Sequence, residues 1–270
     1  MKNLKIALLF LLLTSLTANE EQSLKDRNGY SYVNIASQCM TFTTSYTTKS
    51  GDLIETEART SNPIYITGSL YRITDTLGYS TEISTTLISQ RANENIKVNN
   101  QLVQKDYADM LTNNIQALGH YKLTPAHRVT FGAIYNLSSW KRYNFITPIG
   151  PESTEKVIEQ RDMSLSLQAG YWYEGYHLQD SKLHLNFRSI IGLPIWSKTE
   201  NTAAADTTFS NRGGYGLNFQ LYTGYEIYQH KEIGIMMAYS MVSKNSGKNG
   251  SAVIPKSQIN NTFFGFYIAY

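Results

Sequence analysis

Seven stretches of the sequence between residues 111 and 270 alternate strictly between apolar residues and small or polar residues. An alternation with a period of two is the signature of a β-strand with one apolar face. Each stretch exceeds the ~5–6 residues usual for a strand of a soluble protein and suffices for the ~9–11 residues with which a tilted strand crosses a bilayer. The stretches are 111–123, 128–142, 162–174, 182–197, 213–227, 232–242 and 259–270. This pattern predicts an all-β fold whose strands cross a membrane.

The links between the predicted strands alternate in length. Short links are predicted near 75–77, 124–127, 175–181 and 228–231, and longer polar links at 48–62, 90–108, 143–160, 198–212 and 243–257. Barrels in outer membranes have short turns on the periplasmic side and longer loops outside the cell. The alternation therefore predicts a closed antiparallel barrel that begins and ends on the same side of the membrane, which requires an even number of strands.

The first third of the chain is less regular. Strands are predicted at 31–47, 64–74 and 78–89, where Thr, Ser, Tyr and Ile are frequent. Their faces are poorly separated, since Tyr65 and Thr67 oppose Ile64 and Ile66, and either a bulge or a weakly apolar wall would explain this. The fold class predicted is an antiparallel transmembrane β-barrel of ten strands, with eight or twelve as the alternatives.

The carboxy-terminal residues are aromatic and apolar on one face of the last predicted strand. This face consists of Thr262, Phe264, Phe266, Ile268 and Tyr270. The ending resembles the C-terminal assembly signal of Gram-negative outer-membrane barrels, which include small porin-like proteins, with Tyr where Phe is commoner. The resemblance implies insertion by the barrel assembly machinery and contact with outer-membrane lipid and lipopolysaccharide. It implies no particular activity.

The amino-terminal residues predict export. Residues 1–18 combine Lys2 and Lys5 with a short apolar run and a small-residue exit that ends at Ala18, which is the pattern of a secretory signal peptide. The predicted organisation is a signal peptide at 1–18, a periplasmic lead at 19–30 and the barrel at 31–270. The predicted location is the outer membrane of a Gram-negative bacterium.

Composition excludes some classes of function. The whole chain has 24 basic and 21 acidic residues. Residues 1–18 contain two lysines and no acidic residue, so the rest of the chain has 22 basic and 21 acidic residues. The sequence has no stripe of basic residues that would predict binding to nucleic acid. Cys39 is the one cysteine, so an intrachain disulfide is excluded. The chain is expected to act as a monomer.

Aromatic residues lie near the predicted strand ends. Tyr121 and Tyr171 lie toward the periplasmic side, and Trp140 and Trp196 lie near the outer ends. Such positions are typical of the aromatic girdles at the two membrane interfaces.

Motifs for catalysis are missing from the sequence. Outer-membrane phospholipase and lipid A deacylase carry a His-x-Ser pair on a strand, whereas His120 and His184 are followed two residues later by Lys122 and Asn186. All five histidines map to the periplasmic half, and no metal-binding or phosphate-binding motif is present. We therefore expect no enzyme activity, no catalytic residues, no metal and no cofactor.

Several charged and polar residues fall on the inward face of the predicted barrel. They are Glu82, His184, Arg188, Gln220 and Glu226. His184 and Glu226 lie near the periplasmic ends of neighbouring predicted strands, so contact between them is expected. Charged side chains inside a narrow barrel either fill it as paired structural groups or form a constriction that selects solutes.

Three functions are compatible with this pattern. The first is a narrow porin-like channel for small solutes. The second is a closed structural barrel or adhesin whose function lies on the external loops. The third and weakest is a lipid-modifying or proteolytic enzyme. A continuous side-chain plug across the lumen would favour the second function, and a polar triad at the outer rim would revive the third.

Overall fold

The computed structural model describes residues 29–270 apart from 125, 144–156, 177–181, 203–206, 229–230 and 251. The predicted signal peptide and most of the predicted lead therefore lie outside the described residues. The strands are β1 (Gly29–Thr47), β2 (Leu53–Arg72), β3 (Leu77–Thr86), β4 (Arg91–Val98), β5 (Gln101–Lys122), β6 (His127–Tyr143), β7 (Val157–Tyr176), β8 (Leu183–Asn201), β9 (Thr207–Ser210), β10 (Gly214–Tyr228), β11 (Lys231–Lys244), β12 (Gly247–Asn249), β13 (Ala252–Ile254) and β14 (Lys256–Ala269).

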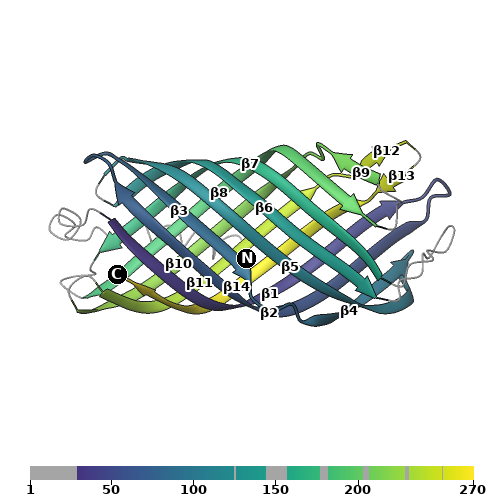
Figure 1. The fold of residues 1–270 in the computed structure, drawn as a ribbon, viewed down its shortest axis with the longest axis horizontal. Coiled ribbons are helices and arrows are strands. Elements are labelled where there is room, and N and C mark those ends of the chain that lie inside the picture. Colours follow the sequence, from purple (N-terminus) through teal and green to yellow (C-terminus); the bar gives the residue numbers. More distant parts are fainter. Residues whose placement is uncertain are drawn as a thin grey trace, which may run out of the picture.

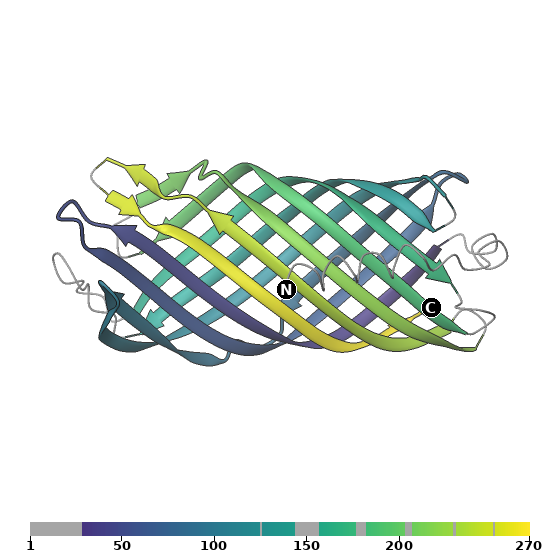
Figure 2. The same ribbon diagram turned by 180° about the vertical axis from the view of Figure 1, so that it is seen from behind.

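The strands form one closed antiparallel barrel with ten positions around its circumference. β1 pairs with both β2 and β14, which closes the sheet. β3 and β4 lie one after the other between β2 and β5 and together occupy a single position. All the strands tilt strongly against the long axis (Figures 1 and 2), as barrel closure requires. The prediction of ten strands is confirmed.

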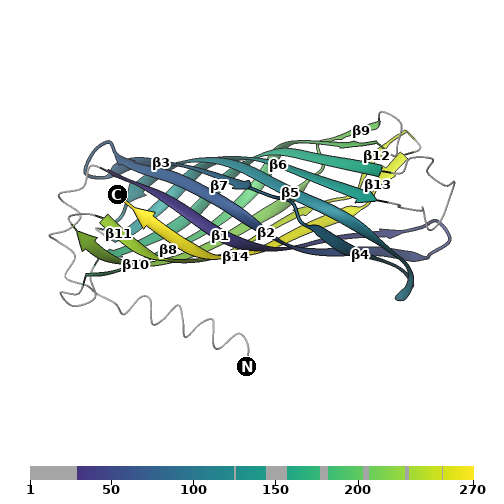
Figure 3. The ribbon, with the colours of Figure 1, turned by 60° about the horizontal axis from the view of Figure 1, so that its bottom comes forward.

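The two ends of the barrel differ. Gly29, where β1 begins, and Tyr270, the last residue, lie at the same end as the short β2–β3 and β5–β6 turns, and we call it the terminal end. Backbone hydrogen bonds of 2.8 and 2.9 Å join Ser31 to Tyr270 there. The opposite end, which we call the hairpin end, holds β4, β9, β12 and β13 (Figure 3).

The predicted long polar links 48–62, 90–108 and 243–257 are for the most part strands, so this prediction is wrong for them. Residues 144–156 and 203–206 of the other two predicted long links lie outside the described residues, as do residues 177–181 and 229–230 of two predicted short links. Residues 48–52 are all that separate β1 from β2, and β4 and β5 are joined through Asn99 and Asn100, whose φ angles are 49° and 66°. Asn tolerates this left-handed conformation, which the tightest hairpin turns require. Strands that project beyond a membrane need no apolar face, so their polar sequences resemble loops.

The outward and inward faces alternate as the sequence predicts. On β14 and at the C-terminus, Thr262, Phe264, Phe266, Ile268 and Tyr270 are all exposed on the outer face, while the residues between them are buried. The outer wall around the barrel carries an apolar band, which includes Ile115, Phe131, Leu193 and Met237. Toward the hairpin end the band stops at a girdle of ion pairs on the outer face. These pairs are Arg59–Glu57, Arg91–Asp109, Lys141–Glu159, Arg161–Glu159 and Lys198–Glu200.

The irregular first third of the chain has an apolar inner face. Ile64, Ile66 and Leu70 of β2 are buried inside the barrel, with Ile64 and Ile66 in a core cluster that contains Phe263 and Tyr267. The two faces of β2 look alike in the sequence because one faces lipid and the other faces this apolar part of the lumen.

The predicted outer aromatic girdle is partly wrong. Trp196 is 40% exposed on the outer wall, but Trp140 is only 5% exposed and lies inside the barrel. The ring centroid of Trp140 is 4.0 Å from that of Phe42, which belongs to β1, a strand not adjacent to β6 in the sheet.

Candidate solute site in the barrel lumen

A layer of hydrogen-bonded side chains crosses the lumen toward the terminal end. We call it the plug layer, and it consists of Tyr32, Glu82, Gln116, Arg188, Gln220 and Tyr222. Arg188 Nη1 lies 3.3 Å from Glu82 Oε2, and Gln220 Nε2 donates to Glu82 Oε1 at 3.2 Å. Tyr32 also donates to Glu82. Because these residues come from β1, β3, β5, β8 and β10, the layer joins strands from around the whole barrel.

The Arg188 guanidinium is held from several directions. It lies over the Trp172 ring, 4.2 Å from the centroid, and it donates to Gln116 Oε1 at 3.4 Å. Gln116 in turn donates to Gln168 at 2.8 Å. Only 2% of Arg188 is exposed. A buried charge is tolerated where an opposite charge and hydrogen bonds satisfy it, as Glu82 and Gln116 do at Arg188 Nη1.

A contact between a histidine and a carboxylate lies closer to the terminal end. His184 Nδ1 is 2.6 Å from Glu232 Oε1, and Tyr267 donates to Glu232 Oε2 at 3.3 Å. Glu226, the predicted neighbour of His184, is half-buried near the end of β10. The carboxylate of Glu232 was overlooked in the sequence, although its position on the inward face of β11 could have identified it as a partner for His184.

One side of the lumen toward the hairpin end is filled by apolar side chains. Met40, Phe42, Ala58, Ala108, Met110 and Trp140 form a buried cluster. These residues come from β1, β2, β5 and β6, so the cluster narrows the lumen on that side.

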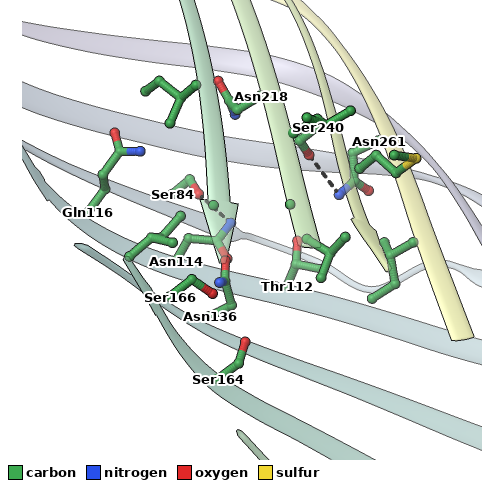
Figure 4. Close-up of a pocket in the computed structure, with 18 of the residues that line it drawn as sticks. Ser84, Thr112, Asn114, Gln116, Asn136, Ser164, Ser166, Asn218, Ser240 and Asn261 are labelled. Carbon is green, nitrogen blue, oxygen red and sulfur yellow. Dashed lines mark hydrogen bonds between the residues drawn. The ribbon is translucent and has the colours of Figure 1, made fainter. Parts of the chain in front are cut away.

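The other side of the lumen holds a cavity of about 100 Å³. Figure 4 shows the hydroxyl and amide side chains around it. Its polar lining includes Ser84, Thr112, Asn114, Gln116, Asn136, Ser164, Ser166, Asn218, Ser240 and Asn261. Ile66, Ile134, Ile190 and Phe263 add apolar surface. Since one water needs roughly 10–15 Å³ by a comparable measure, the cavity has room for several waters or a small solute.

Positive charge lies at the hairpin-end side of the cavity. Lys244 lines the cavity, and its Nζ is 3.7 Å from Asp162 Oδ1. Arg212 Nη1 is 3.6 Å from the same oxygen. Two cations around one carboxylate leave a net charge of +1 in this cluster. Arg212 also donates to the backbone carbonyls of Asn245 and Pro255, which fixes its position.

The predicted lumen residues therefore fall into two groups. Glu82, Arg188 and Gln220 meet in the plug layer, whereas His184 and Glu226 lie nearer the terminal end. Glu82 and Gln220 also line the cavity. The polar cavity and the cationic cluster at Lys244 were not predicted.

Two carboxyl groups face each other in the part of β4 and β5 beyond the girdle. Glu94 and Asp106 are cross-strand partners and are 0% and 4% exposed. Arg142 donates to Glu94 through Nε at 2.9 Å. Burial raises the pKa of Asp106 to about 8, and the neighbouring charge of Glu94 acts in the same direction.

The Asp106 carboxyl should make stability fall as pH rises. Its pKa is near 3.9 in an unfolded chain, so between about pH 4 and pH 8 the folded protein binds the extra proton. The stabilisation is complete below about pH 4 and is lost as pH approaches 8. We expect Asp106→Asn to flatten this dependence in urea unfolding measured at pH 5, 7 and 9. Asp52→Asn is the matched control, because hydrogen bonds from Ser50 and Asn99 lower the pKa of Asp52. Parallel curves for the wild type and Asp106→Asn would contradict the assignment.

The described residues contain neither a cluster of three or more His, Cys, Asp or Glu side chains able to hold a metal ion nor a helix long and apolar enough to span a membrane.

The fold is that of outer-membrane β-barrel proteins. No protein-family model and no curated protein matches the sequence. The structure is similar to the outer membrane protease OmpT from Escherichia coli, with a TM-score of 0.62 and 10% identity over 96% of this chain and 100% of that one. Weaker similarity links it to the translocator domain of the autotransporter NalP from Neisseria meningitidis, with a TM-score of 0.40 and 8% identity over 98% of this chain and 95% of that one. At these identities the likeness concerns the fold alone.

Proposed function

We propose that this protein is a narrow channel for small solutes in the outer membrane of a Gram-negative bacterium, and that the plug layer closes it in the state described here. In this proposal the signal peptide at 1–18 directs export. The terminal end faces the periplasm, and the hairpin end faces the outside of the cell. Lipopolysaccharide would contact the charged girdle.

The observation that carries the proposal is the polar cavity directly beside the plug layer. Gln116 and Gln220 belong to both, so a solute in the cavity would touch the groups that close the lumen. Hydroxyl and amide groups replace the hydrogen bonds that a polar solute makes with water. One ion pair, Arg188–Glu82, lies at the centre of the closure, and charged groups at constrictions select solutes in other pores.

Single-channel conductance in a planar bilayer tests the proposal. We expect rare, small openings from the refolded wild type, because the plug layer fills the lumen. Arg188→Ser combined with Glu82→Ser removes both charges and most of the side-chain volume, and should give frequent, larger steps. The matched control is Arg59→Ser with Glu57→Ser, which removes an exposed ion pair outside the lumen and should behave like the wild type.

A folded double variant that stays silent would contradict the channel and favour a closed surface protein. A specific observation supports this second function: β4 and β5 project beyond the girdle and expose Leu102 and Val103, which are 49% and 52% exposed. Such apolar residues outside the lipid band suit contact with another molecule.

We also propose that the protein is not an enzyme. Two buried acidic side chains toward the hairpin end are engaged by cations, Glu94 by Arg142 and Asp162 by Arg212 and Lys244. The Thr199 hydroxyl group donates a hydrogen bond to Asp162, and Thr199 is fully buried. Absence of hydrolysis of peptide and phospholipid ester substrates by the refolded protein is the expected result.

A further inference from the structure

The ladder of backbone pairs along β8 is interrupted between its pairing with β10 and its pairing with β9. The β8–β10 pairing runs from Leu183↔Tyr225 to Gly192↔Gly216 and stops there. Further along, a backbone hydrogen bond of 2.8 Å joins Asn211 N to Ser197 O. Residues 193–196 of β8 and residues 212–215 therefore face each other without ladder pairing among the described residues. We call this stretch the window, and at ~3.3 Å per residue it is about 13 Å long.

The sequence explains the interruption. Pro194 has no backbone N–H to donate, and within sheets proline is confined to edges and bulges. The β7–β8 register shifts at the same place, between Leu165 and Ser166, where Ile195 is left without a cross-strand partner. Asn211, with φ of 54°, has a left-handed backbone conformation in the segment between β9 and β10.

The outer side of the window is apolar and aromatic. Leu193 and Ile195 are 59% and 57% exposed, and Trp196 and Tyr215 are 40% and 43% exposed. Trp and Tyr favour the depth of the lipid head groups. Lys198, in the girdle, lies just beyond them. The window thus faces the membrane leaflet at the hairpin end, close to its surface.

The inner side of the window is the lumen cavity. Gly192, Pro194, Tyr215 and Gly216 all line it. A Cβ atom on Gly216 would have Met241 O at 3.7 Å as its only near neighbour, and the closest atom to one on Gly192 would be 3.6 Å away. By contrast, a Cβ on Gly132 would lie 2.1 Å from a backbone oxygen. The absence of side chains at Gly192 and Gly216 therefore leaves this part of the lumen open.

The charges suit an amphipathic anion. Lys244 lines the cavity at its hairpin-end side, and with Arg212 it outweighs the charge of Asp162. Glu82, at the other side of the cavity, is paired with Arg188. A carboxylate would lie best near Lys244, while an alkyl chain would contact Ile134 and Ile190 or extend through the apolar window.

We propose that the window is a lateral entrance through which an amphipathic anion, such as a medium-chain carboxylate, passes between the leaflet at the hairpin end and the lumen cavity. The inference rests on the proposed function in that it uses the same cavity as a solute site. It differs in the route, which crosses the wall and does not follow the barrel axis.

Alkylation of a cavity cysteine tests the route. The reporter is Ser164→Cys in a Cys39→Ser background, refolded into lipid vesicles. N-decylmaleimide partitions into the bilayer, whereas a sulfonated maleimide stays in water. We expect the decyl reagent to react faster, and Gly216→Leu, which fills the inner side of the window, to abolish that advantage while leaving the aqueous rate unchanged. Ser84→Leu, which adds a similar volume on β3, is the matched control and should preserve the advantage.

Equal rates for the two reagents, or an advantage that survives Gly216→Leu in folded protein, would overturn the lateral entrance. Decanoate tests the ligand: it should protect the reporter, and Lys244→Met should weaken the protection. Equal protection by decanol would overturn the preference for an anion. The two proposals can fail separately. If the conductance experiment shows no channel but N-decylmaleimide still reacts faster than the sulfonated maleimide, the proposed channel fails and the window stands.

Discussion

Removal of Phe266–Tyr270 is expected to abolish stable insertion of the barrel. These residues pair with Tyr32–Ile35 on β1 and with Glu232–Ile235 on β11, so their loss opens the sheet on both sides of β14. Each backbone group left without a partner in lipid costs several kcal/mol. The variant should fail to show heat-modifiable migration in gels and should be missing from the outer-membrane fraction.

A deletion at the other end provides the control. Replacing Gly247–Ile254, the β12–β13 hairpin, with a short linker removes more residues, but these two strands pair with each other and not with the barrel sheet. This variant should migrate like the wild type. Tyr270→Asp, which places a charge at a position 61% exposed on the lipid side, should also impair insertion, whereas Tyr270→Phe should be tolerated. Normal migration of the Phe266–Tyr270 deletion would refute the role of the closing strand.

Arg188→Met is expected to lower the free energy of unfolding by about 3–5 kcal/mol, the usual cost of leaving one member of a buried ion pair alone. Glu82 is 11% exposed at its side chain and would keep its charge inside the lumen. Urea unfolding of the protein refolded in detergent measures the effect. Adding Glu82→Gln to Arg188→Met should restore most of the stability, because no unpaired charge then remains.

The exposed pair of the girdle is the comparison. Arg59 and Glu57 are 74% and 36% exposed at their side chains, so Arg59→Met should cost at most about 1 kcal/mol. Equal losses for Arg188→Met and Arg59→Met, or no rescue by Glu82→Gln, would show that the plug layer does not depend on its central ion pair.

Alternation predicted most of the fold but misplaced particular residues. It identified the lipid-facing side of β14 and the inward positions of Glu82, Arg188 and Gln220. It assigned polar segments such as 90–108 to loops, because a strand that stands in water on the outside has no apolar face to reveal it. Trp140 was assigned to the outer aromatic girdle because it lies near a strand end. Its position is an even number of residues from Asn136, which faces inward, so the alternation itself placed Trp140 on the inner face.

The sequence by itself determined which face of each strand meets lipid, because neighbouring residues point to opposite sides of a sheet. It also determined the positions of the β2–β3 and β5–β6 turns and of the apolar closing strand. Only the tertiary structure decided which inward side chains meet across the lumen, such as Arg188 with Glu82, Phe42 with Trp140 and His184 with Glu232. The odd or even position of a residue in its strand gives the face of the sheet on which it lies, but not the residue that it contacts across the lumen. Those contacts follow from the tilt and stagger with which the whole sheet closes.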